Sequence, residues 1–302
     1  KTDFNSISHI FDKTISCAGQ AHDHSSKFSI CESSEQLENF RAIVGSTNYK
    51  GREGIEFYPQ ELFILHYDAE IPTSDGKVAV QNFQNKKSKY RIPVETFILE
   101  KEFLQPLIKG VNIERFHLNP SSLVVPFPYN VGHREPISIK ELTLISPLLA
   151  KFFNRFKSVI SAQTDYNAKI IGEKHNTEFY ALARVGLYSY APHYVAYRDN
   201  TKWGACVVSS LETPWGEMKR PQFQNHAVSI SQTVSGRYIT LDEAHYICAI
   251  LNSPIVTKYV LNSSDSRTFK IDLDINIPEF DSGNVIHARL SELSVSAHTN
   301  FA

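Results

Sequence analysis

The chain has 302 residues, of which 31 are Lys or Arg and 32 are Asp or Glu, so its formal net charge is −1. This balance excludes a uniformly basic nucleic-acid-binding protein, but it allows a basic face opposite an acidic one. The length suggests one large or two smaller domains, and a hydrophobic fraction of 42% is sufficient for a packed core.

The cysteine content and the hydropathy pattern favour a reducing cytoplasm. The four cysteines form no CxxC pair and no disulfide framework. No apolar run approaches the roughly 18 residues of a membrane span, and no signal peptide is visible at the start. Because the chain begins with Lys1 and contains a single methionine, Met218, we expect a cytoplasmic fragment of a longer protein.

The first forty residues combine a polar segment with a predicted helix start at Ser33–Gln36. Two thiols and two imidazoles fall within fifteen residues here, and four such ligands could hold zinc tetrahedrally. Their spacing matches no ordinary zinc finger, so a polar loop is the alternative interpretation. The four residues are Cys17, His22, His24 and Cys31.

A glycine-bracketed loop follows at residues 45–54 and carries Asn48, Tyr49 and Arg52. Glycine allows close approach of the backbone to a ligand, and Asn and Arg can pair bidentately with adenine and guanine edges. The alternative is an ordinary hairpin loop with solvated side chains. Apolar residues 62–65 then predict a buried strand.

Residues 92–162 predict a core strand and a long helix. Leu104, Leu107 and Ile108 should be buried, whereas Lys109 and Arg115 could neutralise phosphate. Residues 123–127 predict another buried strand. Apolar residues recur at three- and four-residue steps over 137–162, which predicts a helix. We place a domain boundary near residue 135, dividing a β-rich part, 1–135, from a linking helix and α+β part, 136–302.

The segment Phe179–Trp203 is the most aromatic in the chain. Aromatic and small residues alternate here, and Gly186 and Pro192 interrupt the run, which predicts short strands or extended structure. One interpretation is a β core whose rings fill space. The other is a nucleic-acid face, where cations meet phosphate and rings stack on bases. Its rings and cations are Tyr180, Tyr188, Tyr190, Tyr194, Tyr197, Trp203, Arg184, Arg198 and Lys202.

The last third predicts a β-rich stretch at 227–239 and a second helix. Thr240 and Glu243 fit a capping box that begins this helix, which runs to about residue 261, with Pro254 bending it or breaking it. A polar loop with Arg267 follows it.

Several segments resemble, in the same order, the target-recognition region of N6-adenine DNA methyltransferases of restriction–modification systems, including those fused to a nuclease. That family shows a Gly-Arg-Val-Gly-x-Tyr-x-Phe-Ala-Pro run and then Val-x-x-Arg-Asp. Here Ala183 stands at the first Gly and Tyr190 at the Phe. The segments are Leu99–Phe116, Ala183–Pro192, Val195–Asp199, Tyr246–Pro254 and Asn276–Asp281, with a weaker match over 41–66.

The resemblance implies a strand-rich, two-part α+β recognition region that has a linking helix and a second C-terminal helix. It implies that the chain binds double-stranded DNA beside a methyltransferase catalytic domain. The candidate DNA contacts are Asn48, Tyr49, Arg52, Lys109, Arg115, Arg184, Tyr188, Tyr190, Arg198, Lys202 and Arg267.

The motifs of methyl transfer itself are missing from the sequence. There is no Asn/Asp/Ser-Pro-Pro-aromatic clamp and no Gly-rich strand–turn–helix for S-adenosylmethionine. We therefore expect no catalytic residue, cofactor or metal in this fragment, with the cofactor held by a catalytic domain in cis or in trans. Two alternatives remain open: a magnesium-dependent nuclease using Asp199, Glu217 and Lys219, and a non-catalytic protein-interaction module.

Overall fold

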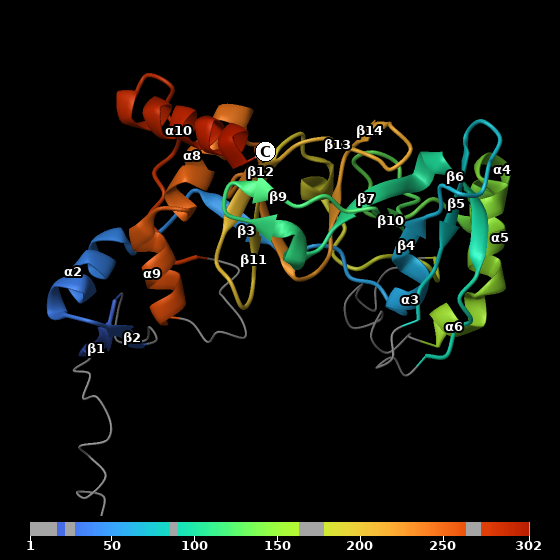
Figure 1. Ribbon diagram of the computed structural model, residues 1–302, viewed down its shortest axis with the longest axis horizontal. Coiled ribbons are helices and arrows are strands. Elements are labelled where there is room, and N and C mark those ends of the chain that lie inside the picture. Colours follow the sequence, from blue (N-terminus) through green and yellow to red (C-terminus); the bar gives the residue numbers. More distant parts are fainter. Residues whose placement is uncertain (1–16, 22–27, 85–89, 163–177, 264–272, 302) are drawn as a thin grey trace, which may run out of the picture.

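A computed structural model describes residues 17–21, 28–84, 90–162, 178–263 and 273–301. The fold combines helices with strands that form several small sheets, which confirms the predicted α+β class. The two larger sheets lie at opposite sides of the molecule, each with its own helices (Figure 1). Arg267, His22 and His24 lie outside the described residues.

The first sheet has six strands, and all its pairings but one are antiparallel. The exception is the pair formed by the strands at Gln222–Phe223 and Leu104–Ile108, which run parallel. The predicted strand over 123–127 is confirmed, and Val124 and Val125 are buried. In spatial order the strands are β15 (Gln222–Phe223), β7 (Leu104–Ile108), β10 (Leu123–Pro126), β4 (Leu65–Tyr67), β5 (Lys77–Gln81) and β6 (Thr96–Glu100).

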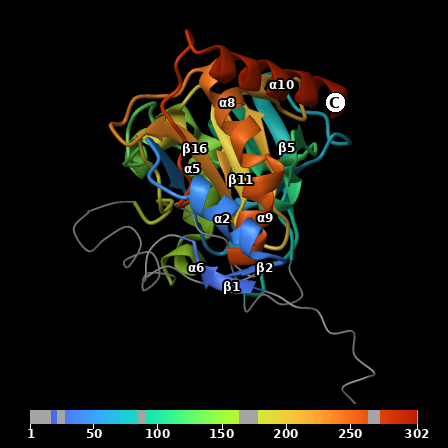
Figure 2. The same ribbon diagram turned by 90° about the vertical axis from the view of Figure 1, so that its left-hand side faces the viewer.

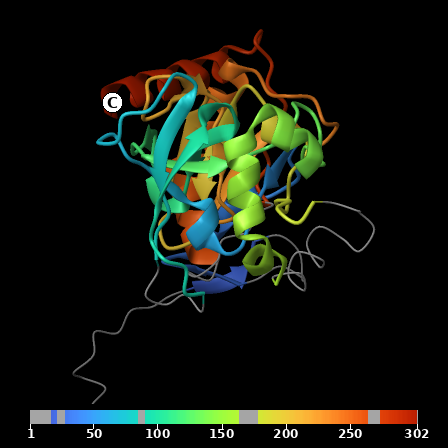
Figure 3. The ribbon, with the colours of Figure 1, turned by 90° about the vertical axis from the view of Figure 1, so that its right-hand side faces the viewer.

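Three consecutive helices cover this sheet, where the sequence predicted one. They are α4 (Ile139–Ile145), α5 (Pro147–Arg155) and α6 (Lys157–Ser161), coloured yellow-green in Figure 3. Pro147 lacks an amide hydrogen and therefore starts α5 instead of continuing α4. Glu100 sits at this junction. Burial alone would raise its pKa, but hydrogen bonds from the Leu148 and Leu149 amides and the Ser146 hydroxyl outweigh burial, and its pKa is lowered.

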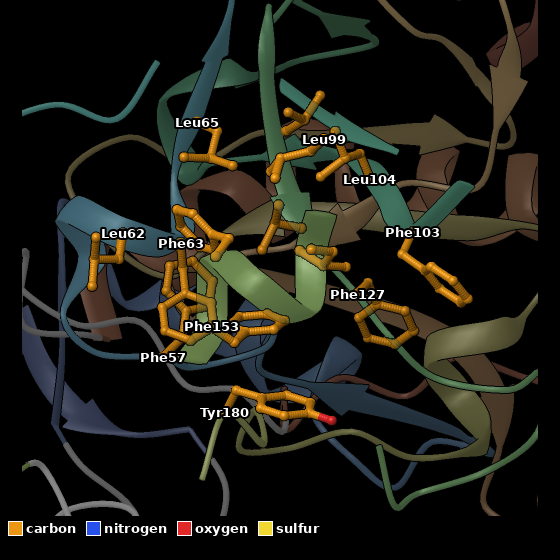
Figure 4. Packing of buried hydrophobic residues seen from close by; sticks show 14 of the residues in the cluster. Phe57, Leu62, Phe63, Leu65, Leu99, Phe103, Leu104, Phe127, Phe153 and Tyr180 are labelled. Atoms are coloured by element: carbon orange, nitrogen blue, oxygen red, sulfur yellow. The ribbon is translucent and has the colours of Figure 1, made fainter. Parts of the chain in front are cut away.

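The core beneath these helices is aromatic (Figure 4). Phe153 is fully buried and stacks on Tyr180, with ring centroids 4.4 Å apart and planes 8° from parallel. The Tyr180 hydroxyl donates to the Ile137 carbonyl at 2.5 Å, so the start of the Phe179–Trp203 segment is fastened to this core.

The second sheet has four antiparallel strands and supports the other half of that segment. Helix α8 (Leu241–Leu251) packs on it, with α2 (Ser34–Ile43) and α9 (Pro254–Ser263) nearby, and α10 (Val285–Phe301) packs on α8 (Figure 2). Two helix starts are as predicted: the Ser33 hydroxyl caps α2, and Thr240 and Glu243 form the capping box of α8. The strands are β12 (Ala205–Val208), β11 (Tyr194–Arg198), β16 (Ala227–Thr233) and β3 (Tyr49–Arg52).

Strand pairing crosses the predicted boundary at residue 135 in both directions. Strand β3 from the first part pairs with β16, and β15 from the second part pairs with β7. A small apolar cluster that includes Ile108, Tyr194 and Phe223 lies where the two sheets approach each other. The division at 135 stays a prediction, and each sheet uses strands from both sides of it.

Two predicted strands are wrong. Residues Gln60–Phe63 form the short helix α3, and the strand β4 begins only at Leu65. Residues 178–186 form turns and isolated bridges, and Leu187–Tyr190 form the 3-10 helix η3. The reason is local: Arg184 has φ of 62°, which reverses the chain and is incompatible with a continuing strand.

Three short hairpins complete the described fold. They are β1 (Cys17–Gln20) with β2 (Phe28–Cys31), β8 (Ile113–Glu114) with β9 (His117–Leu118), and β13 (Leu211–Glu212) with β14 (Met218–Lys219). Turns η1 (Lys101–Phe103) and η2 (Gly110–Asn112) flank β7.

Helix α10 is held by two neutral histidines. His298 accepts a hydrogen bond from the Val207 amide at Nε2 (2.9 Å) and donates from Nδ1 to the Ser294 carbonyl (2.7 Å). His245 of α8 contacts the Ser294 hydroxyl, with 3.1 Å between Nδ1 and Oγ. Burial, and then the neighbouring His298, lower the pKa of His245 to about 4, and burial also lowers the pKa of His298.

We expect the chain to lose stability as the pH falls from about 6.5 towards 4. In this range the unfolded chain binds protons at both imidazoles more readily than the folded chain, in which burial lowers the pKa of both, so acid favours unfolding. Urea unfolding at a series of pH values should show the free energy decreasing through this window. The His245→Gln variant should flatten the decrease, and an unchanged slope in that variant would contradict the assignment.

Candidate nucleic-acid interface

An arginine–tyrosine pair joins the strand β3 to the turn η3, which are distant in the sequence. The guanidinium of Arg52, at the end of β3, lies 5.1 Å from the centroid of the Tyr188 ring. The Tyr188 hydroxyl donates to the Arg184 carbonyl at 2.5 Å. Burial raises the pKa of Tyr188, while nearby Arg52, Arg184 and Arg134 oppose the rise. Tyr188 is therefore a neutral ring between cations.

Two further arginines lie beside the same turn. The guanidinium of Arg220 is 5.6 Å from the centroid of the Tyr190 ring. The Tyr190 hydroxyl donates to the His133 carbonyl at 2.6 Å, which places the turn containing exposed Arg134 against η3. We call Arg52, Arg134, Arg184 and Arg220, with Tyr188 and Tyr190, the arginine cluster.

Two carboxylates partly neutralise the arginine cluster. Arg184 contacts Glu53 at 2.5 Å and Glu56 at 3.3 Å. Glu56 is only 7% exposed, and burial raises its pKa although Arg184 acts in the opposite direction. Both carboxylates contact Arg184, whereas the guanidinium groups of Arg52 and Arg220 lie over tyrosine rings.

A narrow pocket opens beside the cluster but has no room for a small organic ligand. It is bordered by Glu53 and Gly54 after β3, by Tyr188 and Ser189 of η3, and by the segment 221–223. Its free space accommodates about one water molecule. This pocket therefore does not enclose a small substrate, and the cluster beside it offers guanidinium groups and the half-buried Tyr188 ring for recognition.

A second group of predicted contacts lies around Glu114. Both Arg198 and Lys202 approach its carboxylate at 3.9 Å. The Arg198 side chain is only 12% exposed and donates to the Thr201 hydroxyl at 2.9 Å, whereas Lys202 is 71% exposed. Arg115 is exposed and donates to the Asn252 carbonyl. Lys202 and Arg115 are the accessible cations of this group.

The other predicted contacts are placed separately. Tyr49 is 3% exposed, and its hydroxyl donates to Glu243 at 2.8 Å and accepts from the Phe280 amide at 2.9 Å. That position gives Tyr49 a structural role. Asn48 is exposed, and its carbonyl accepts from the Val234 amide. Lys109 is half-buried next to η2.

The structure thus brings Arg52, Arg184, Tyr188 and Tyr190 together, and it adds Arg134 and Arg220, which sequence reasoning missed. Arg220 stands in a polar loop between predicted strands, and Arg134 follows a turn-forming glycine, Gly132. Those loop positions were the available signals, but neither indicates which ring the arginine would approach.

The residues considered for a nuclease or a zinc site have other partners. Asp199 is 5% exposed and contacts the exposed His226, with 2.8 Å between Oδ2 and Nδ1. Glu217 contacts Lys101, lies 3.8 Å from the Lys219 ammonium and accepts from the Trp215 indole at 3.0 Å, whereas Asp199 lies apart from this pair. Cys17 and Cys31 face each other on β1 and β2. Within the described ranges, no three His, Cys, Asp or Glu side chains are grouped to hold a metal ion.

A scan against protein-family models and a search of curated proteins each found no match to the chain. In the described part of the chain, every helix is too short or too polar to cross a bilayer.

Proposed function

We propose that the chain binds duplex DNA as the target-recognition part of an N6-adenine DNA methyltransferase or restriction–modification enzyme. The observation that supports this proposal is the arginine cluster, in which Arg52 lies over the half-buried Tyr188 ring with Arg184 and Arg134 nearby, and Arg220 lies over the buried Tyr190 ring. Guanidinium groups bind phosphate oxygens and guanine edges bidentately.

The contacts within the cluster suggest different tasks for its members. Arg52 is ordered on the Tyr188 ring, so it would lose little conformational freedom on binding. Arg134 is exposed and the Arg220 guanidinium lies over the Tyr190 ring, so both would neutralise phosphate. Arg184 already has Glu53 and Glu56, and a phosphate would have to compete with them. We therefore rank Arg184 below the other three.

Methyl transfer would take place on a partner. A catalytic domain, in cis or in trans, would bind S-adenosylmethionine and receive the target adenine after it leaves the base stack. The cations around Glu114, chiefly Arg115 and Lys202, would add phosphate contacts that fix the register of the chain on the duplex.

We expect Arg220→Ala to weaken duplex binding by at least about 1 kcal/mol, or about fivefold in Kd. The lost phosphate contact should also reduce the slope of log K against log salt by about 1. Fluorescence anisotropy of a labelled duplex, titrated at several salt concentrations, measures both quantities.

Arg41→Ala is the matched control, because it removes one positive charge from α2, where Arg41 contacts Glu38. It should leave affinity and salt slope nearly unchanged. Equal effects of the two variants would show that binding depends only on net charge, and duplex binding that is absent or insensitive to salt would reject the proposal in favour of a protein-interaction module.

A further inference from the structure

The hairpin of β1 and β2 places two free thiols directly opposite each other. Cys17 is the cross-strand partner of Cys31 in the antiparallel register, and neither forms a disulfide. Opposed residues of an antiparallel pair have Cα atoms about 4.5–5.5 Å apart and share one face of the sheet. A disulfide needs a Cα separation of about 4.4–6.8 Å, so the backbone is already in the required range.

The surroundings of the two thiols differ in a way that suits sequential reaction. Cys31 is 2% exposed and belongs to the core that includes Leu37 and Phe40, whereas Cys17 is only partly buried against the same core. Burial, and then the nearby Cys17, raise the pKa of the Cys31 thiol. Cys17 is therefore the thiol that a reagent reaches first, and Cys31 is positioned behind it.

We propose that Cys17 and Cys31 form a dithiol–disulfide site that reacts with low-molecular-weight disulfides. The Cys17 thiolate attacks one sulfur of the small disulfide, giving a mixed disulfide and releasing one small thiol. The Cys31 thiolate then attacks the Cys17 sulfur, which closes the cross-strand bond and releases the second small thiol. The protein dithiol is oxidised by two electrons, and the small disulfide is reduced by two.

The other two cysteines provide an internal comparison. Cys206 of β12 and Cys248 of α8 also interact, but both are fully buried. Burial raises the pKa of Cys248 to about 12 and raises that of Cys206 as well. Since both sulfur atoms of this pair are fully buried, a small disulfide reaches neither, and the pair should stay reduced while the chain is folded.

A cross-strand bond would act on more than the hairpin. The Ser29 hydroxyl of β2 lies 2.6 Å from the Ser263 hydroxyl at the end of α9, and α2 packs against both β2 and α9. Fixing β1 to β2 would therefore restrain the helix pair that packs beside the second sheet. This inference is independent of DNA binding.

Trypsin mapping after oxidation tests the site, because Lys27 lies between the two cysteines. The full chain is incubated with oxidised glutathione at mildly alkaline pH, blocked with N-ethylmaleimide in denaturant and digested without reductant. We expect peptide 14–27 joined to peptide 28–41 by a disulfide, with Cys206 and Cys248 alkylated. Reductant should abolish the joined species.

The Cys31→Ser variant is the matched control, since it keeps the reachable thiol and removes the second one. It should accumulate Cys17 as a stable glutathione mixed disulfide, with circular dichroism like that of the parent chain. The proposal is overturned if the parent chain under the same conditions keeps both thiols free, stops at the mixed disulfide, or joins other cysteine pairs as readily as Cys17 and Cys31.

Discussion

Replacing Glu243 by alanine should lower the free energy of unfolding by about 3 kcal/mol. The carboxylate is 2% exposed and accepts from the Tyr49 hydroxyl at 2.8 Å and from Arg237 at 2.8 and 2.9 Å. Burial alone would raise its pKa, but the Arg237 and Tyr49 hydrogen bonds outweigh burial and lower it. Alanine would leave the Tyr49 hydroxyl with a lost acceptor and would remove half of the α8 capping box. Urea unfolding at neutral pH measures the loss.

Glu292→Ala is the control for this change. Glu292 is 64% exposed and pairs with Arg289 one helical turn away, so its removal should cost less than about 0.5 kcal/mol. The Tyr49→Phe variant removes the hydroxyl that donates to Glu243, and so tests the same hydrogen-bond network from its Tyr49 end. If Glu243→Ala were no more costly than the control, the network would not hold β3 against α8.

Replacing Phe153 by alanine should cost about 4 kcal/mol, because a buried ring leaves a cavity that rigid neighbours cannot fill. Phe153 is fully buried, stacks on Tyr180 and lies 6.0 Å from the Phe63 ring, centroid to centroid. The same change also removes the stacking partner of Tyr180, a ring near the start of the segment that leads into the arginine cluster. Calorimetric or urea unfolding would measure the expected loss.

Phe28→Ala is the corresponding surface control, since the same ring is removed at a position that is 63% exposed. It should have little effect on stability. A small effect at Phe153 as well would mean that the aromatic core under α5 is loosely packed. Duplex binding by the folded fraction of Phe153→Ala would then report whether η3 depends on this support.

Features encoded by neighbouring residues were predictable. Ser33 caps α2 and Thr240 with Glu243 begins α8, because a capping residue acts on amides two or three positions away. The buried strand at 123–127 was also visible as a short apolar run. These elements depend on local chemistry that one window of sequence contains.

The candidate site was only partly predictable, because its geometry depends on contacts between remote segments. Arg184 has a positive φ, so alternation of residue types around it did not correspond to a strand. The stacking of Arg52 on Tyr188 requires β3 to pair with β16, and no local pattern specifies that pairing. Tyr49 likewise stands in a glycine-rich loop pattern, yet its partners Glu243 and Phe280 come from much later in the chain.

The exchange of strands between the two sheets limits how segments of this chain can be recombined with those of related proteins. A recombinant that joins residues 1–135 to the second half of a divergent relative would force β3 to pair with a foreign β16, and β7 with a foreign β15. Viable chimaeras would have to inherit both members of each strand pair together. Changes that preserve both sheets should therefore arise as point changes in loops, or as replacement of the whole unit.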